Sequence, residues 1–362
     1  MRAVVRRILF IGPHRPDRNP SQRFRMEQFF PYLNQAGIAY DYSWYLSAAD
    51  DTVWYQPGQW LQKARIVAKA FLTRLKDVWR KNHYDVVFVQ REAFMLGTAW
   101  FERHLKSRRT RLIYDFDDAL WLGDTSNANA RFAWLKRPTK INRILKTADL
   151  VIAGNDYLAA YAQKFNSQVI VIPSVVDTER FRPKQPDSEK QRLCIGWSGS
   201  HTTYRHFQLV LPALTTIHEK FKDQIQITVL GNMPPGERAL PIRWEKWTPE
   251  TEHEQLSNFD IGLMPLPEEE WSKGKCGFKA LLYMAVGAVP VVSPVGVNSK
   301  IVQHGNTGFH ATTNEEWISV LSQLITDAGL RQKVGGQARR FVEQHFSLQA
   351  LAERWVNVLL SV

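Results

Sequence analysis

The sequence predicts an α/β protein made of two doubly wound domains, each built around a parallel β-sheet. The chain has 362 residues, which is about twice the length of an ordinary domain. Short, continuous apolar runs recur along it, as in strands that are covered on both faces of a parallel sheet. Segments with helical periodicity separate these runs, and this alternation is typical of doubly wound sheets.

The predicted strands and helices alternate along both halves of the chain. The strands are Ile8–Ile11, Val86–Val89, Leu112–Tyr114, Leu150–Ala153, Val169–Ile172, Cys194–Trp197, Ile225–Leu230, Ile261–Met264 and Val289–Val292. The helices are Ser21–Ala36, Trp60–Lys81, Asn155–Lys164, Arg205–Phe221, Gly277–Val286, Glu315–Thr326 and Leu330–His345.

A polar segment separates the two groups of strands. Residues 177–190, DTERFRPKQPDSEK, contain two prolines and show no apolar period, as expected of a linker. We therefore expect an N-terminal domain over residues 1–178, a linker over 179–191 and a C-terminal domain over 192–345. A last helix over 346–362 is expected to cross back to the first domain, and the two Rossmann-like domains are expected to face each other across a cleft.

Composition indicates a reduced, cytoplasmic protein. The sequence contains no apolar run of the roughly 18 residues that a membrane span requires. The apolar patch Ile8–Ile11 is too short for a signal peptide and ends in Gly-Pro, as a first strand and its turn would. Cys194 and Cys276 show neither disulfide nor metal spacing. We expect no metal and no resident cofactor.

The positive charge of the chain lies entirely in its first half. Residues 1–183 hold 29 basic and 17 acidic residues, whereas the remainder holds 18 of each. Such a surface attracts polyanions, namely phospholipid headgroups, nucleic acid or a diphosphate-bearing acceptor. A basic surface with no partner except counterions is the alternative.

The strongest motif is a loop that leads into a short helix, within residues 271–298, WSKGKCGFKALLYMAVGAVPVVSPVGVN. The helix is predicted to start at Gly277, where its free N–H groups and positive dipole end would suit an anionic diphosphate. Lys273, Lys275 and Lys279 add positive charges there. A solvated loop with incidental lysines is the alternative.

This segment is similar to the donor-binding segment of retaining GT-B glycosyltransferases of family 4, the glycosyl transferases group 1. YMAVGAVPVV resembles the family's "EAMAxGxPVV", and IPSVVDTERFRP resembles "xPNGVDxxxFxP". IGWSGS and DIGLMPL resemble the first strand of the nucleotide domain and the strand before the donor loop. The resemblance implies a GT-B fold, a nucleotide-diphosphate sugar as co-substrate and catalysis without a metal.

The chain departs from the family at two places. Gly274 and Leu282 stand where the family carries two glutamates, so we expect Glu269 or Glu270 to approach the donor sugar instead. Trp197 occupies the place of a diphosphate-binding arginine. Its substitutes are expected among the nearby polar residues Ser198, Ser200 and Arg205.

Aspartates crowd the end of a first-domain strand in YDFDDALW, residues 114–121. They could bind Mg²⁺, act as acid or base, or cap a helix, as Asp118 could do. The resemblance implies that this place faces the donor sugar. Asp115 and Asp117 are therefore candidate catalytic residues.

Basic and glycine-rich loops follow two other first-domain strands. The first contains Gly12, His14, Arg15 and Arg23, and the second contains Arg91. Arginine suits phosphate because its planar fork bonds two oxygens. The resemblance implies that the first loop lies between donor and acceptor. His14 is a candidate general base, although a loop histidine is more often an ordinary surface residue.

Two further segments complete the candidate sites. Trp60–Lys81 is a basic amphipathic helix that fits an anionic membrane interface or, alternatively, packs onto its own sheet. By resemblance Trp247 and Thr248 border the nucleobase, and packing in the core is the alternative for Trp247.

Together these features predict a retaining glycosyltransferase that uses a nucleotide-diphosphate sugar and a glycan or lipid-linked acceptor. It is expected in the cytoplasm, peripherally at the inner face of the membrane. A sugar-nucleotide epimerase of the same fold is the alternative. A protein that binds polyanions or nucleic acid is disfavoured because the basic half lacks a recognisable stacking platform. No GxGxxG follows the first strand, which argues against a dinucleotide oxidoreductase.

Overall fold

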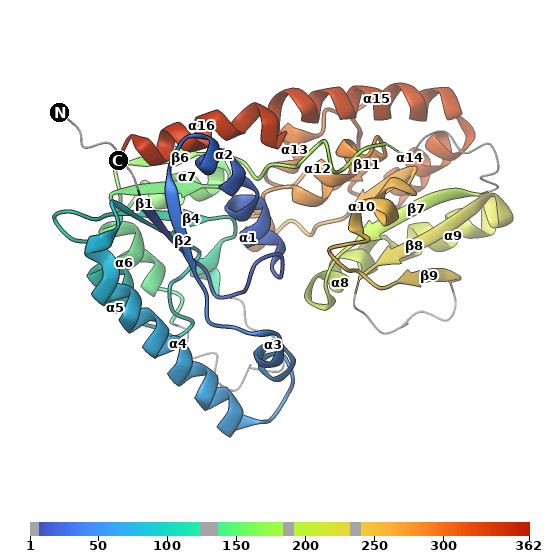
Figure 1. Ribbon diagram of the computed structural model, residues 1–362. Helices are drawn as coiled ribbons and strands as arrows, with labels where there is room; N and C mark the ends of the chain where they lie inside the picture. The colour runs from blue at the N-terminus through green and yellow to red at the C-terminus, as the bar shows by residue number, and fades with distance from the viewer. Residues whose placement is uncertain (1–6, 124–136, 184–191, 232–239) are drawn as a thin grey trace. The chain divides into compact units, whose positions relative to one another are not determined.

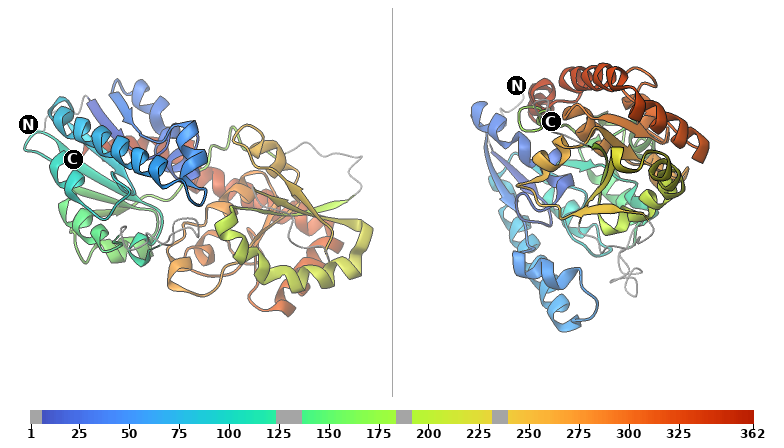
Figure 2. Two further views of the ribbon diagram at one scale, coloured as in Figure 1. Left: turned by 90° about the horizontal axis from the view of Figure 1, so that it is seen from below. Right: turned by 90° about the vertical axis from the view of Figure 1, so that its right-hand side faces the viewer.

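The structure is a computed structural model that describes residues 7–123, 137–183, 192–231 and 240–362. The chain divides into two compact units. Unit 1 consists of Met1–Ser174 and Ala352–Val362, and unit 2 consists of Val175–Leu351. Each unit contains one parallel sheet with helices around it (Figures 1 and 2).

The sheet of unit 1 has six parallel strands in the order β2-β1-β3-β4-β5-β6. The strand order reverses between β1 and β3, and ligands of such sheets bind where this happens, at the carboxyl ends of the strands. The strands are β1 (Arg7–Ile11), β2 (Ala39–Ser43), β3 (Val86–Gln90), β4 (Arg111–Phe116), β5 (Leu150–Ala153) and β6 (Val169–Val171).

The helices of unit 1 cover this sheet, with α4, α5 and α6 packed side by side. The C-terminal helix α16 (Leu348–Leu360) contributes its residues from Ala352 onward to the same unit. Its Trp355 is buried and stacks on Phe29 at 4.4 Å between ring centroids. The other helices are α1 (Pro20–Arg25), α2 (Phe30–Gln35), α3 (Ala48–Trp54), α4 (Trp60–Arg80), α5 (Trp100–Leu105), α6 (Lys140–Thr147) and α7 (Asp156–Ala162), with 3₁₀ turns η1 (Glu27–Phe29), η2 (Lys81–His83) and η3 (Leu120–Leu122).

The sheet of unit 2 has six parallel strands in the order β12-β11-β10-β7-β8-β9. This is the strand order of a dinucleotide-binding Rossmann sheet, and its order reverses between β7 and β10. The strands are β7 (Leu193–Ser198), β8 (Ile225–Leu230), β9 (Ile242–Glu245), β10 (Ile261–Met264), β11 (Val289–Val292) and β12 (Phe309–His310).

The helices of unit 2 pack on its sheet in two groups. Side chains of α9 and α14 join β7, β8 and β10 in one apolar core, whereas α12 and α15 pack together and against β11. The helices are α8 (Tyr204–Phe207), α9 (Leu211–Phe221), α10 (Glu252–Ser257), α11 (Glu270–Lys273), α12 (Phe278–Ala285), α13 (Asn298–Ile301), α14 (Asn314–Thr326) and α15 (Ala328–His345), with 3₁₀ turns η5 (His201–Thr203), η6 (Gln208–Val210) and η7 (Lys222–Gln224).

The prediction of two parallel α/β domains is confirmed. The strands that the sequence missed, β2, β9 and β12, all lie at the edge of a sheet. Their side chains are mostly half-buried, so they lack the continuous apolar run of a strand that is covered on both faces.

Two predicted helices are interrupted in the structure, each near a proline. The predicted helix Ser21–Ala36 divides into α1, η1 and α2, with Pro31 in the first turn of α2. The predicted helix Arg205–Phe221 divides into α8, η6 and α9, with Pro212 in the first turn of α9. Proline is favourable in a first turn and disruptive inside a helix, so these positions are new helix starts.

The predicted linker is not entirely a solvated connection. Phe181 is buried, and Arg339 of α15 donates to its carbonyl, so this part of the segment belongs to unit 2. The change between units occurs at Ser174/Val175, before the predicted position. Residues 184–191 of the predicted linker lie outside the described part of the chain.

Helix α4 buries different residues from those that the sequence pattern suggested. Arg74 is one of the basic residues of this helix, yet it is fully buried, and Asp77 pairs with it at 2.7 Å. Trp79 is one of its large apolar residues, yet it is 75% exposed. A polar network inside the unit therefore replaces part of the expected apolar contact. Among the described residues, no helix is both long and apolar enough to cross a bilayer.

Candidate active site

In unit 2 most of the predicted donor residues lie at or after the ends of β7 and β10, the two strands between which the strand order reverses. β7 ends in Trp197 and Ser198 and leads into α8, which carries Arg205. The chain after β10 forms α11 and then α12, which carries Lys279. Since parallel strands share one carboxyl edge, these two connections meet there, where ligands of such sheets bind.

Four cationic or titratable side chains gather at this edge and form what we call the cation cluster: Arg205, His206, Lys275 and Lys279. The charges of Lys275, Lys279 and Arg205 all act on the imidazole of His206. Burial and these charges lower the pKa of His206 to about 4. Burial and the charge of Lys275 lower the pKa of Lys279 to about 7. A site that holds several like charges so close favours an anion that neutralises them.

Aromatic rings support the two lysines of the cluster. The Lys279 ammonium lies 4.6 Å from the centroid of the Trp197 ring, and the Lys275 ammonium lies 5.5 Å from that of Trp271. Trp197 is itself buried and packs against Phe207. A cation over an indole face is attracted by the negative face of the ring, so Trp197 holds Lys279 at the strand end without a carboxylate.

Ser198, a predicted donor ligand, forms a backbone hydrogen bond that holds α12 in place. Its backbone N–H donates to the Tyr283 hydroxyl at 2.9 Å, and that hydroxyl donates to the Leu263 carbonyl at 3.2 Å. Because Tyr283 belongs to α12, this chain of bonds ties α12 to β7 and β10. It fixes where Lys279, one turn earlier, stands.

Gly277 begins α12 in a conformation that few other residues adopt. Its φ is +67°, and a Cβ added there would lie 2.4 Å from Ile301 Cδ1. Gly277 is the N-cap of α12 and, having no side chain, makes no side-chain cap. Glycine is therefore required here both by the backbone and by the packing.

Other predicted donor residues serve local structure or stand on the surface. Ser200 caps the turn η5 through Thr202 and Thr203, and Thr248 starts α10 by accepting from the Glu252 N–H. Glu269 caps α11 and accepts from Ser272, whereas the exposed Glu270 pairs with Lys273 at 2.7 Å. Trp247 is half-buried in the loop after β9. Both glutamates thus stand at the exposed start of α11.

In unit 1 the predicted catalytic Asp115 is completely buried. Its carboxylate forms a two-bond ion pair with Arg25, which also donates to the Ile172 carbonyl at 2.5 Å. Burial raises the pKa of Asp115 to about 6 against the opposing effect of Arg25. An aspartate with both oxygens bonded inside the core fits a structural role better than contact with a sugar.

Asp117 and Arg91 lie together at the same edge of the sheet. Arg91 donates from Nε to Asp117 at 2.8 Å and from Nη2 to Asp118 at 2.7 Å. The Ser21 hydroxyl also donates to Asp117, at 2.5 Å. Burial would raise the pKa of Asp117, but the charge and hydrogen bond of Arg91 outweigh it and lower the pKa. The pair is partly exposed and remains a candidate for contact with substrate.

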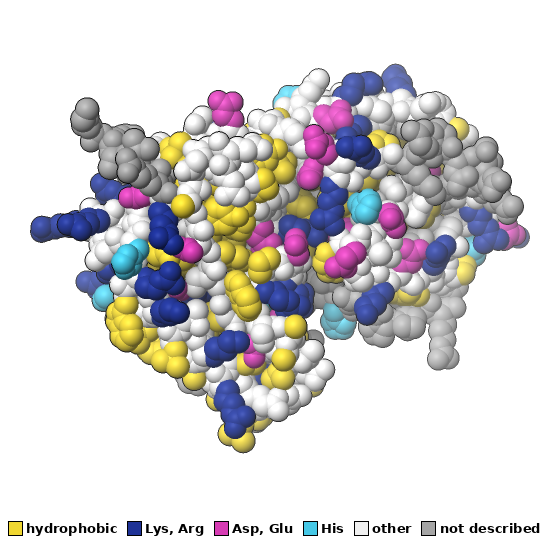
Figure 3. Space-filling model, in the orientation of Figure 1, with side chains coloured by type: hydrophobic (Ala, Val, Ile, Leu, Met, Phe, Trp, Pro, Cys, Tyr) yellow, Lys and Arg dark blue, Asp and Glu magenta, His cyan; other side chains and the backbone are white. Residues whose placement is uncertain are grey.

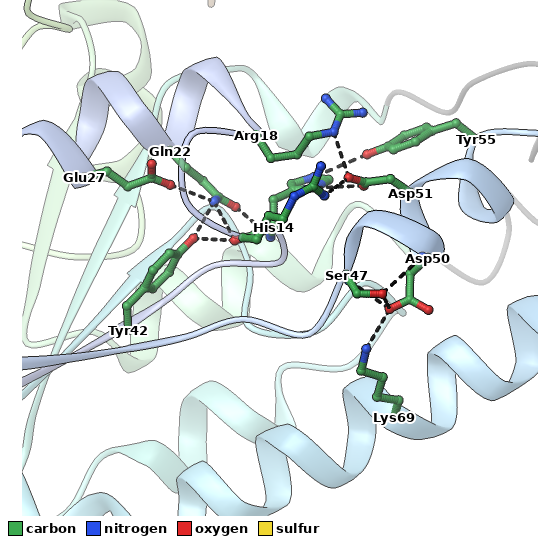
Figure 4. Close-up of polar contacts among 11 residues, drawn as sticks. His14, Arg18, Gln22, Glu27, Tyr42, Ser47, Asp50, Asp51, Tyr55 and Lys69 are labelled. Atoms are coloured by element: carbon green, nitrogen blue, oxygen red, sulfur yellow. Dashed lines mark hydrogen bonds and ion pairs between the residues drawn. The ribbon is translucent and has the colours of Figure 1, made fainter. Parts of the chain in front are cut away.

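The loop after β1 builds a second polar network around His14 (Figure 4). His14 is 5% exposed; its Nδ1 lies 3.6 Å from Asp51 and its Nε2 lies 3.3 Å from the Tyr55 hydroxyl. Burial lowers the pKa of His14, so the ring is neutral at pH 7. Arg15 and Arg18 also bind Asp51. Burial would raise the pKa of Asp51, but His14 and these two arginines lower it to about 2. The exposed member of the network is Tyr55, not His14.

The remaining acceptor-side predictions fall around this network. Gly12 cannot carry a side chain, because a Cβ would lie 2.9 Å from Gln22 Oε1. Gln22 in turn brackets His14, accepting from its N–H at 3.0 Å and donating to its carbonyl at 3.1 Å. Arg23 is buried over the ring of Phe24.

Several residues of these sites escaped the sequence reasoning, among them His206, Asp51 and Tyr55. His206 could have been found, since it follows Arg205 directly in the connection after β7. Asp51 and Tyr55 belong to α3 and its end, a helix that the sequence did not predict. No spacing rule connects them with His14, because only the folded loop brings them together.

Comparison with solved structures defines the class of this protein. Sucrose-phosphate synthase from Thermosynechococcus elongatus superposes with a TM-score of 0.73 at 15% identity, over 98% of both chains. HepE from Anabaena, solved with UDP and glucose, gives 0.68 at 16% identity, over 98% of this chain and 99% of that one. A glycosyltransferase from Rickettsia africae gives 0.69 at 14% identity, over 98% and 97%. The fold is the GT-B fold.

A match to a family model lies in unit 2. Residues 192–327 match the family model described as "Glycosyl transferases group 1". The match lies within unit 2 and contains the whole cation cluster. The chain thus carries a glycosyl transferases group 1 domain in a GT-B fold and is a glycosyltransferase. No curated protein sequence matches the chain.

Proposed function

We propose that this chain transfers a sugar, with retention of configuration, from a nucleotide-diphosphate sugar to a glycan or lipid-linked acceptor. The observation that carries the proposal is the cation cluster at the point where the strand order of unit 2 reverses. Its charges come from both connections that meet there, after β7 and after β10. HepE, which shares the fold, was solved with UDP and glucose.

In this mechanism the donor diphosphate lies at the start of α12, beside Lys275 and Lys279. As the bond to the sugar breaks, negative charge grows on the leaving phosphate, and the two ammonium groups stabilise it. Electrostatic stabilisation of this kind commonly contributes more to catalysis than any other single effect. The leaving phosphate itself accepts the proton of the acceptor hydroxyl on the same face of the sugar. Catalysis by this route uses neither a metal nor a resident cofactor.

The donor is tested with a panel of nucleotide diphosphates and their sugars, measured by thermal shift. A nucleotide at about 100 times its dissociation constant should stabilise the protein by about 2.7 kcal/mol. NMR of the best-binding nucleotide sugar then separates the chemistries, since an epimerase converts it without acceptor, whereas a transferase releases nucleotide diphosphate when an acceptor is added. The absence of stabilisation by every nucleotide diphosphate would contradict the proposal.

We propose further that unit 1 associates peripherally with an anionic membrane surface, at the cytoplasmic side, through the outer face of α4. This face consists of Leu61, Leu72 and Trp79, which are 82%, 63% and 75% exposed. They are eleven and seven residues apart, or about three and two turns at 3.6 residues per turn, so they lie on one line.

Basic residues accompany this apolar line. Arg65 and Lys76 are exposed on the same side of α4, and Figure 3 shows yellow hydrophobic and dark blue basic side chains together over this helix. Three large apolar side chains on one face are costly in water and favourable at the boundary of headgroups and acyl chains. Each basic residue near an anionic surface adds about 1 kcal/mol.

Vesicle sedimentation tests this surface. The protein should bind vesicles that contain phosphatidylglycerol and bind pure phosphatidylcholine much less. The double variant Leu72→Gln/Trp79→Gln should weaken binding about tenfold or more. The burial of each apolar side chain in the membrane contributes up to about 1.5–3 kcal/mol to the free energy of binding. Leu209→Gln is the matched control, because Leu209 is 51% exposed on unit 2. Equal binding by the double variant and the control would contradict the proposal.

A further inference from the structure

His206 is a buried polar residue for which the described part of the chain provides no partner. It is 2% exposed, and neither ring nitrogen has a hydrogen-bond partner among the described residues. Leaving a buried polar group unpaired costs roughly 1–3 kcal/mol. A residue kept at such a cost beside three cations indicates that something else completes its bonding when the site is in use.

Among the residues that the structure describes, the charged groups that act on this imidazole are basic. They come from its own helix α8 (Arg205), from the loop before α12 (Lys275) and from α12 (Lys279). The acids nearest in sequence are engaged elsewhere, Glu269 with Ser272 and Glu270 with Lys273. Within the described residues, neither Lys279 nor Arg205 forms an ion pair with a carboxylate. An anionic ligand would therefore neutralise charge that these two side chains leave uncompensated.

Lys279 is the member of the cluster whose pKa lies near neutrality. It is half-buried, with its amine over the Trp197 ring, and Lys275 is its charged neighbour. Burial and Lys275 lower its pKa to about 7, so near neutrality a large fraction of the amine is uncharged. An anion beside the amine would oppose both effects, because its negative charge favours the protonated form.

We propose that the cation cluster binds the donor diphosphate together with one proton, which the Lys279 amine takes from solvent as the anion enters. The amine becomes an ammonium, and His206 stays neutral and donates one ring N–H to the anion. This inference rests on the proposed donor site. It adds that donor affinity depends on pH through a single lysine.

The sign of the pH dependence follows from the lowered pKa. Below pH 7 the amine already carries its proton, so affinity is constant. Above pH 7 each binding event must take up a proton, and the dissociation constant rises about tenfold per pH unit until the pKa of the bound state is reached. The stability of the free protein changes in the opposite sense. Above pH 7 the Lys279 amine is protonated in the unfolded chain but not in the folded one. The contribution of Lys279 to folding stability therefore increases as the pH rises from about 7 toward 10.5, the ordinary pKa of a lysine.

Sulfate is the first probe, because it remains a dianion throughout this range and contains neither sugar nor base. The dissociation constant is obtained from thermal shift of the full chain at pH 6 to 9, with chloride holding the ionic strength and cationic buffers throughout. UDP-glucose is the second probe, since its diphosphate has no oxygen that titrates near neutrality. The variants are Lys279→Arg, which keeps a permanent charge, and Lys333→Ala, which removes an exposed charge from α15.

The expected result is a sulfate dissociation constant that is flat from pH 6 to 7 and rises about tenfold per unit above it, both in the wild type and in the surface control Lys333→Ala. UDP-glucose should follow the same profile, and Lys279→Arg should bind either probe with a flat one. A flat wild-type profile, an unchanged slope in Lys279→Arg, or no protection by sulfate at any pH would overturn the proposal. A slope confined to the range below pH 7 would assign the proton to His206 and would equally overturn it. If the protein gave the predicted sulfate profile but transferred no sugar, the proposed function would be refuted and the proton uptake by Lys279 would stand.

Discussion

Lys279→Ala is expected to lower kcat/KM for the nucleotide sugar by about 10²–10³, the loss found when one stabilising donor is removed from a developing negative charge. The reason is geometric. Lys279 is held half-buried over Trp197 at the end of β7, beside the start of α12. A charge in such a site is screened by water less than a surface charge. Steady-state kinetics with saturating acceptor measure the effect.

The control for this prediction separates catalysis from folding. Lys333→Ala removes an equal charge from an exposed position of the same unit and should leave kcat/KM within about twofold, since surface substitutions change little. The melting temperature of Lys279→Ala without ligand should not fall at pH 7, because the charged amine is disfavoured in the folded protein. Near-normal turnover at saturating nucleotide sugar would refute the role of Lys279.

Arg74→Met is expected to destabilise unit 1 by about 3–5 kcal/mol, because it leaves the buried Asp77 charge without its partner. Arg74 is fully buried and pairs with Asp77 at 2.7 Å. It also donates to the carbonyls of Ala93 at 2.6 Å and Gly12 at 2.8 Å. The substitution therefore also frees the backbone of the loop that carries His14. Urea denaturation of the full chain measures the loss.

Two further variants make this prediction specific. Arg65→Met, on the exposed face of the same helix, should change stability by less than about 0.5 kcal/mol. The double variant Arg74→Met/Asp77→Asn should recover part of the loss, since replacing both members of a buried pair is less costly than removing one. If Arg74→Met lost less than about 1 kcal/mol, the network would not be what anchors α4.

Most strands of both sheets could be predicted because each is a continuous run of apolar residues. β3 and β11 are buried at every position, so burial on both faces selects an unbroken apolar run. The helix of residues 278–285 was equally visible, with Gly277 before it and Gly287 after it. Edge strands such as β2 carry a mixed pattern, and the sequence alone does not distinguish them from loops.

The candidate site was predicted only in part. Residues that follow a strand could be found from the sequence, whereas contacts between residues far apart in sequence could not. Lys275, Lys279 and Arg205 were found because each stands in a connection after a strand, and parallel strands bring such connections to one edge. The choice between a ligand and a structural ion pair could not be made in this way. Asp115 and Asp117 are two residues apart, yet the first is paired with Arg25 in the core and the second is partly exposed beside Arg91.

The sequence by itself determined the class of fold and most of the strands and helices, because periodicity and glycine positions are local properties of the chain. Only the tertiary structure decided the state of each charged group. Arg74 is a charged residue in sequence, but the fold places it in the interior. Burial and the charge of Lys275 lower the pKa of Lys279. These depend on residues far away in sequence, such as Trp197 for Lys279 and Asp51 for His14, which only folding brings within reach.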